Sequence, residues 1–163
     1  MIQTQVEVSN SSELYESDFY AWTVEQAKFL RDRAWNSLDI PNLVEEIESL
    51  GKQERQKLRS RLAILLGHLL KWEFQPSYRS NSWLGTIREQ RRRIIELLEE
   101  NPSLKPYLPE AKEKTYQDGL DLAVQETSLS YKIFPSECPY DLEQVLDSKF
   151  FPGLQLDNDP KVD

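Results

Sequence analysis

The feature that most constrains the fold is an apolar stripe between residues 58 and 72. Its members recur at alternating spacings of four and three residues, and two further leucines widen it. They are Leu58, Leu62, Leu65, Leu69 and Trp72, with Leu66 and Leu70 beside them. Because an α-helix turns once every 3.6 residues, this spacing places all of them on one face. The sequence therefore predicts a long amphipathic helix from about Gln53 to Phe74, ended by Pro76 and packed against a core.

Helical patterns lie on both sides of this segment, and no strand-like alternation has a useful length. Other expected helices cover about residues 18–35, 39–51, 81–101 and 110–127, with a short lid helix after the crossing that begins at Phe134. Gly51 is a stop or a bend between the second helix and the long one. Gly119 costs its helix about 1 kcal/mol relative to alanine, so we expect a close helix approach there.

The predicted fold class is all-α, a single-domain bundle of five to six helices with a short C-terminal lid helix. A length of 163 residues suits one core, and 39% apolar with 29% charged residues is typical of a folded domain. Residues 14–153 form the predicted bundle. Residues 1–13 and the acidic tail 154–163 lack sustained periodicity, so we expect both to be flexible.

Cysteine content and hydropathy restrict the compartment. Cys138 is the single cysteine, which excludes an internal disulfide and multi-cysteine zinc sites and fits a reducing compartment. No standard export signal and no run of 18 apolar residues occur. We therefore expect a cytoplasmic protein with no membrane association.

Charge is unevenly distributed along the chain. The net charge is −8, yet residues 52–93 hold 11 Lys or Arg and 3 Asp or Glu, a net of +8. One interpretation is a basic patch that binds nucleic acid. The favoured one is that the basic central segment packs beside the acidic flanks of the same chain. Helical spacing also spreads Arg91, Arg92 and Arg93 over different faces, which weakens a nucleic-acid patch and favours a solvated face.

Four polar residues form the candidate site. Glu45 and Glu46 belong to the one tight carboxylate cluster, and His68, the single histidine, borders the apolar stripe. Arg91 falls inside the apolar arc of its helix, where an unpaired guanidinium would be strongly destabilising. We therefore expect Arg91 to pair with an acid from another helix, first of all Glu46 or Glu45.

The chemistry open to these residues is limited. Carboxylates with a histidine can hold a divalent cation, which keeps metal binding open. However, no Glu-x-x-His pattern and no second histidine accompany His68, so a structural role is favoured for it and for Arg91. No catalytic residue is assigned and no cofactor is expected.

Several separate segments resemble one family in the same order along the chain. They are Glu16-Ser-Asp-Phe-Tyr-Ala-Trp-Thr, Leu43-Val-Glu-Glu-Ile-Glu-Ser-Leu-Gly, His68-Leu-Leu-Lys-Trp, Ser82-Trp-Leu-Gly-Thr-Ile-Arg-Glu-Gln-Arg and Phe134-Pro-Ser-Glu-Cys-Pro-Tyr. From about Tyr15 to Pro152 the chain resembles the domain of unknown function 29 family, which is abundant in cyanobacteria. The resemblance implies a compact helical bundle in a bacterial cytoplasm. The family has no established activity, so it supplies no catalytic residue.

The favoured function is a non-enzymatic interaction or regulatory module that binds another protein. Two alternatives stay open at this point. One is a metal-binding or hydrolytic bundle that uses Glu45, Glu46, His68 and Arg91 together. The weaker one is nucleic-acid binding through residues 52–93. The sequence does not specify the oligomeric state.

Overall fold

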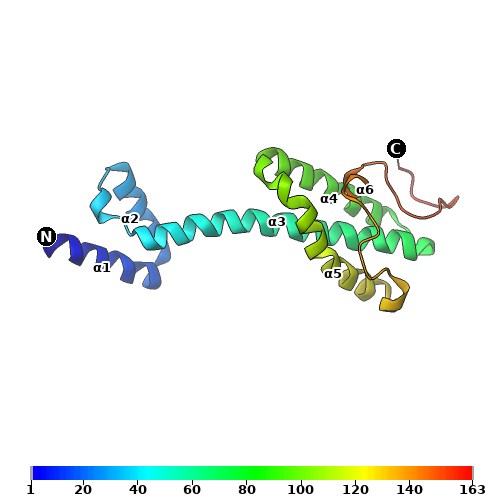
Figure 1. Cartoon of the computed structure of the whole chain (residues 1–163), viewed down its shortest axis with the longest axis horizontal. Helices are drawn as coiled ribbons and strands as arrows, with labels where there is room; N and C mark the ends of the chain where they lie inside the picture. Colours follow the sequence, from blue (N-terminus) through cyan, green and yellow to red (C-terminus); the bar gives the residue numbers. More distant parts are fainter. Residues whose placement is uncertain (1, 163) are drawn as a thin grey trace. The chain divides into compact units, whose positions relative to one another are not determined.

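The computed structural model describes residues 2–162, with side chains from residue 10 onward. Within these residues the chain is helical and contains no strand, which confirms the predicted all-α class. The helices are α1 (Ile2–Ser17), α2 (Phe19–Arg31), α3 (Ile40–Phe74), α4 (Asn81–Glu100), α5 (Leu108–Thr127) and α6 (Leu142–Leu146) (Figure 1). Short 3-10 helices, η1 to η4, lie at Trp35–Ser37, Pro76–Tyr78, Pro102–Tyr107 and Tyr131–Ile133.

The helices form two compact units. The first extends to Gln53 and the second begins at Glu54, so the boundary falls inside α3. The first unit contains α1, most of which lies in the segment that was predicted to be a flexible end. Of the two predicted flexible ends, Met1 and Asp163 lie outside the described residues, and the bounds 14–153 stay a prediction.

The beginning of α2 follows the sequence, but its end does not. The Asp18 carboxylate accepts a hydrogen bond from the backbone N–H of Ala21 at 3.0 Å and caps the helix. The helix ends at Arg31, four residues earlier than expected. Arg33 adopts a φ of 56°, a left-handed conformation that an α-helix cannot continue through.

A buried polar corner holds α2 against the beginning of α3. The indole Nε1 of Trp22 donates to Asp39 Oδ2 at 3.1 Å, and Asn42 Nδ2 donates to the same oxygen at 2.7 Å. Gln26 Oε1 accepts from the backbone N–H of Asp39 at 2.8 Å. Trp22, Gln26 and Asp39 are all buried, so these bonds satisfy polar groups that water cannot reach.

The expected break at Gly51 is wrong, because α3 runs as one helix of 35 residues from Ile40 to Phe74. Gly51 lies in its interior, and among the described glycines only Gly153 has a positive φ. A glycine within a helix costs only about 1 kcal/mol relative to alanine. The uninterrupted hydrogen bonding of a long helix tolerates that cost.

The second unit contains the main hydrophobic core. Its centre is the row of apolar residues from Leu58 to Trp72 on α3, in which Leu58, Leu62, Leu65 and Leu69 are completely buried. Apolar side chains from α4, α5 and α6 complete the cluster, among them Ile87, Ile94, Ala111, Leu120, Ala123 and Val145. The long helix is therefore a core element from Leu58 onward, as its pattern predicts.

Two glycines allow α5 to cross the second half of α3 at close range (Figure 1). A Cβ atom at Gly119 would lie 3.0 Å from the Ala63 carbonyl oxygen and 3.1 Å from the Gly67 backbone nitrogen. A Cβ atom at Gly67 would lie 2.8 Å from the Gly119 carbonyl oxygen. The close approach predicted at Gly119 is confirmed, and Gly67 is its counterpart on α3.

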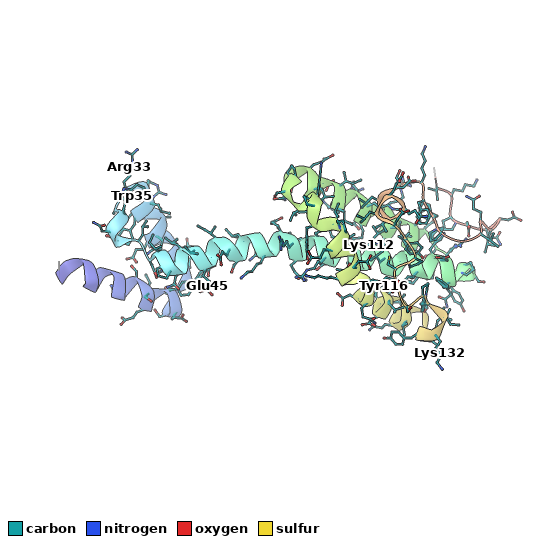
Figure 2. All side chains as sticks on the ribbon, viewed as in Figure 1. Arg33, Trp35, Glu45, Lys112, Tyr116 and Lys132 are labelled. Carbon is teal, nitrogen blue, oxygen red and sulfur yellow. The ribbon has the colours of Figure 1, made fainter. Side chains whose placement is uncertain are left out.

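Side chains of α5 also fix the proline-rich crossing at residues 134–140. Figure 2 labels Lys112 and Tyr116, one turn apart on this helix. Lys112 Nζ donates to the Tyr140 carbonyl oxygen at 2.7 Å, and the Tyr116 hydroxyl donates to the Pro135 carbonyl oxygen at 2.6 Å. These bonds hold the crossing against the bundle before it enters α6.

Candidate interaction surface

The first half of α3 carries a row of exposed apolar side chains. The exposed fractions are 52% at Ile40, 49% at Val44, 67% at Ile47 and 61% at Leu50. Their spacing of four, three and three residues places them on one face of the helix over about 15 Å of its length. We call these four residues the α3 stripe.

The α3 stripe continues the pattern that forms the core of the second unit. At about 100° per residue, Ile40 and Leu58 have the same angular position on the helix. Leu58 has no exposed surface, whereas about half of Ile40 is exposed. One amphipathic helix therefore has its apolar face covered in its second half and open in its first half. A large side chain left exposed forgoes about 1.5–3 kcal/mol that its burial would contribute.

Other apolar side chains of the first unit are exposed as well. On α2, Tyr20 and Val24 are exposed, and Trp35 is exposed in η1. Figure 2 shows Trp35 and Arg33 at the turn that follows α2. Nine of the large apolar residues with high exposure lie between Phe19 and Leu50. Exposed apolar side chains gathered in one part of a protein are typical of an interaction surface.

Acidic side chains border the α3 stripe. Residues 1–53 contain ten Asp or Glu and four Lys or Arg, a net charge of −6. On the helix, Glu48 lies beside Val44, and Glu46 lies on the opposite border beside Leu50. Glu45 and Glu48 are exposed, and Figure 2 labels Glu45 on this part of α3. The surface therefore combines apolar contact area with negative charge.

Glu46 has a partner within the first unit. Its Oε1 accepts a hydrogen bond from the Tyr15 hydroxyl at 2.6 Å, which ties α1 to α3. This hydrogen bond raises the pKa of Tyr15 to about 12, because the donated proton is held by a carboxylate. The ring of Tyr15 packs edge-on against Trp22 at 4.9 Å between centroids.

His68 lies on α3 in the second unit, where it is 8% exposed. Its Nδ1 lies 2.9 Å from the Ile64 carbonyl oxygen one turn earlier, so that nitrogen carries the proton as a donor. Burial lowers the pKa of His68, and the nearby Lys71 lowers it further. The neutral imidazole is therefore favoured in the folded protein.

This lowered pKa predicts a loss of stability in mild acid. The unfolded chain takes up a proton at His68 near the ordinary pKa of 6.5, whereas the folded protein resists doing so. Because the unfolded state then binds more protons, stability falls as the pH falls through 6.5. Urea denaturation at pH 7.5 and pH 5.5 measures the effect. His68→Gln should abolish the difference in stability, because no other side chain of this protein has an ordinary pKa between 5.5 and 7.5. An equal loss of stability in that variant would contradict the assignment of the effect to His68.

The ion pair expected between Arg91 and Glu46 or Glu45 stays a prediction, because these residues belong to different units. Within its own unit, Arg91 donates to backbone carbonyl oxygens of residues 144–150. Arg91 Nε donates to Val145 at 2.9 Å, and Nη2 donates to Phe150 at 2.8 Å and Gln144 at 3.3 Å. Carbonyl groups in the last turn of a helix lack intrahelical partners, so the end of α6 supplies acceptors that a sequence pattern does not reveal. Burial still lowers the pKa of Arg91 to about 10.

The four candidate residues of the predicted polar site divide between the units. Glu45 and Glu46 belong to the first unit, and His68 and Arg91 belong to the second. Within the second unit, His68 and Arg91 bond to different backbone carbonyls. Among the residues with described side chains, no group of three or more His, Cys, Asp or Glu is placed to hold a metal ion.

Two buried cations of the second unit are not predicted by the sequence pattern. Lys71 is buried, forms an ion pair with Glu126 and lies 4.4 Å over the ring of Trp83. The other is Arg79, which follows η2. The sequence feature that indicates burial of Lys71 is its position between Leu70 and Trp72 in an apolar run.

Burial raises the pKa of the Cys138 thiol, which disfavours the reactive thiolate.

Comparison with known families gives a match over most of the chain. The model of the family described as "Domain of unknown function DUF29" matches residues 14–151, which is most of the chain. The chain belongs to this family. Comparisons with curated proteins and with solved structures gave no match.

The DUF29 match includes parts of both compact units. It begins within α1, contains the whole α3 stripe, and ends at Phe151. The last residues, from Pro152 onward, follow the matched region. In the described part of this DUF29 chain, no helix is both long and apolar enough to cross a membrane.

Proposed function

We propose that this DUF29 protein is a helical interaction module that binds another protein through the α3 stripe. The observation that supports this most directly is the exposure of Ile40, Val44, Ile47 and Leu50 on one face of α3. In the second half of the same helix, the equivalent face is buried by neighbouring helices. A partner helix would cover the first half in the same way.

The chemistry of the surface favours a basic amphipathic helix as the partner. Four apolar side chains over about three turns match the anchors that an amphipathic helix presents at every third or fourth residue. Glu46 and Glu48 at the two borders would face lysine or arginine residues beside those anchors. A second copy of this chain would instead bring its own glutamates to the same borders, where like charges repel.

A charge at the centre of the α3 stripe should weaken binding strongly. The probe is a fluorescently labelled helical peptide with leucine at every third or fourth position and lysine elsewhere. We expect Ile47→Glu to weaken its binding by about tenfold or more, since it removes a buried anchor and places a carboxylate in the contact. Fluorescence anisotropy measures the affinity.

The matched control is Ile95→Glu, because Ile95 is an exposed isoleucine on a helix of the second unit. This variant should bind the peptide as the unmodified protein does. A second peptide with glutamate in place of lysine should not bind. Equal binding to both variants, or to both peptides, would refute the proposal. Light scattering tests the rival occupant, since a dimer that Ile47→Glu dissociates would mean that a second copy covers the stripe.

A further inference from the structure

A buried arginine at the end of the domain is bonded to the C-terminal tail. Arg79 follows η2, and its side chain is only 2% exposed. Its Nε donates to the Trp72 carbonyl oxygen at 2.8 Å, and the guanidinium lies 5.1 Å from the centroid of the Trp72 ring. These contacts fix the guanidinium against α3, with its two Nη groups directed at the tail.

The tail supplies the remaining acceptors. Arg79 Nη1 donates to Asp159 Oδ2 and to the Leu154 carbonyl oxygen, each at 2.7 Å, and Nη2 donates to the Pro152 carbonyl oxygen at 3.4 Å. Asp159 Oδ2 also accepts the backbone N–H of Leu156 at 2.9 Å, which closes a small turn around the carboxylate. One carboxylate and two backbone carbonyls are therefore held by a single side chain.

The arginine and its tail acceptors lie on opposite sides of the end of the family match. Arg79 and Trp72 lie inside the region that matches the family, whereas all three tail acceptors follow Phe151, where the match ends. The tail does not fill the site completely, because a hollow of about 210 Å³ remains between Trp72, Arg79, Phe151 and the residues of the tail. The domain thus presents the donors, and an added segment satisfies them.

We propose that Arg79 and Trp72 form a binding site for an extended acidic peptide, and that residues 152–159 occupy this site within the chain. A ligand that fits this site has an aspartate or glutamate carboxylate that accepts a hydrogen bond from Nη1. It also has backbone carbonyl oxygens in the places that those of Leu154 and Pro152 now occupy. Apolar side chains beside the carboxylate would enter the hollow next to the Trp72 ring. Binding of a partner's segment requires the tail to leave.

A charge-assisted hydrogen bond is the strongest of the tail contacts, so its removal should open the site. The test uses the full chain with Asp159→Asn, and the probe is a labelled peptide of residues 152–162. We expect this variant to bind the peptide about tenfold or more tightly than the unmodified protein, because its own tail competes less well. Hydrogen exchange of the tail amides should increase in the same variant.

Two controls separate the site from general effects. Asp157→Asn removes an exposed carboxylate of the same tail and should leave both peptide affinity and exchange unchanged. A peptide that carries asparagine at the position of Asp159 should not bind. Adding Arg79→Lys to the Asp159→Asn variant should abolish binding while circular dichroism shows the helices intact, since lysine lacks the second nitrogen donor group.

Two outcomes would overturn the proposal. If the tail amides stay protected in Asp159→Asn, the carboxylate does not hold the tail in place. If the tail amides exchange freely but the peptide still does not bind, the site accepts no external acidic peptide. Neither result would depend on the α3 stripe, which lies in the other unit.

Discussion

Gly67→Ala should lower the free energy of unfolding by about 1–3 kcal/mol, the range for overpacking a well-packed contact. A Cβ atom at this position would lie 2.7 Å from Leu122 Cδ2 and 2.8 Å from the Gly119 carbonyl oxygen. The leucine methyl group can rotate away. The carbonyl oxygen belongs to the backbone of α5, so relief requires the two helices to move apart. Urea denaturation followed by circular dichroism measures the change.

Gly85→Ala is the matched control for this prediction. Gly85 lies inside α4, and a Cβ atom there would meet nothing within 4 Å. The same substitution should therefore stabilise the protein by about 0.5–1 kcal/mol, because alanine restricts the unfolded chain and favours a helix. Opposite signs for the two variants would identify the helix crossing as the cause. A Gly67→Ala variant as stable as the unmodified protein would contradict the close approach.

Arg91→Met should lower the free energy of unfolding by about 3 kcal/mol. The substitution leaves the carbonyl oxygens of Val145 and Phe150 without the guanidinium that they share, and each buried unsatisfied group costs about 1–3 kcal/mol. Relief of the buried charge offsets part of this loss. Thermal denaturation should show the lower Tm, and hydrogen exchange should show α6 opening first.

The control for Arg91 is its neighbour on the same helix. Arg92→Met removes a side chain that is largely exposed and only loosely paired with Glu96, with 3.8 Å between nitrogen and oxygen. We expect the free energy of unfolding of the Arg92→Met variant to differ from that of the unmodified protein by no more than about 0.5 kcal/mol. If Arg91→Met were equally harmless, the three carbonyl contacts would contribute nothing to the attachment of α6.

The two proposals assign different chemistry to the two units. The first unit is acidic and has an exposed apolar stripe, which suits a basic amphipathic helix. The second unit holds a buried arginine whose acceptors come from the tail, which suits an acidic peptide. The variants Ile47→Glu and Asp159→Asn therefore test separate surfaces, and the failure of one proposal leaves the other unaffected.

The sequence by itself determined the helices from α2 onward and one of their contacts, but not α1. Local patterns are sufficient for the stripe from Leu58 to Trp72 and for the glycine that marks the crossing of α5, because each depends on the sequence of a single helix. The continuity of α3 through Gly51 does not follow from the sequence. A glycine that is suited to a helix stop is also tolerated within a helix, and the sequence pattern does not distinguish the two cases.

The tertiary structure decided which polar and apolar groups are covered. The partners of Arg91 are backbone carbonyls, and every residue type carries a carbonyl, so no sequence pattern identifies them. The α3 stripe and the apolar residues from Leu58 to Trp72 have the same periodicity along one helix. Only the residues from Leu58 to Trp72 are buried by neighbouring helices. Periodicity specifies which face of a helix is apolar, but the presence of a covering element depends on the rest of the fold.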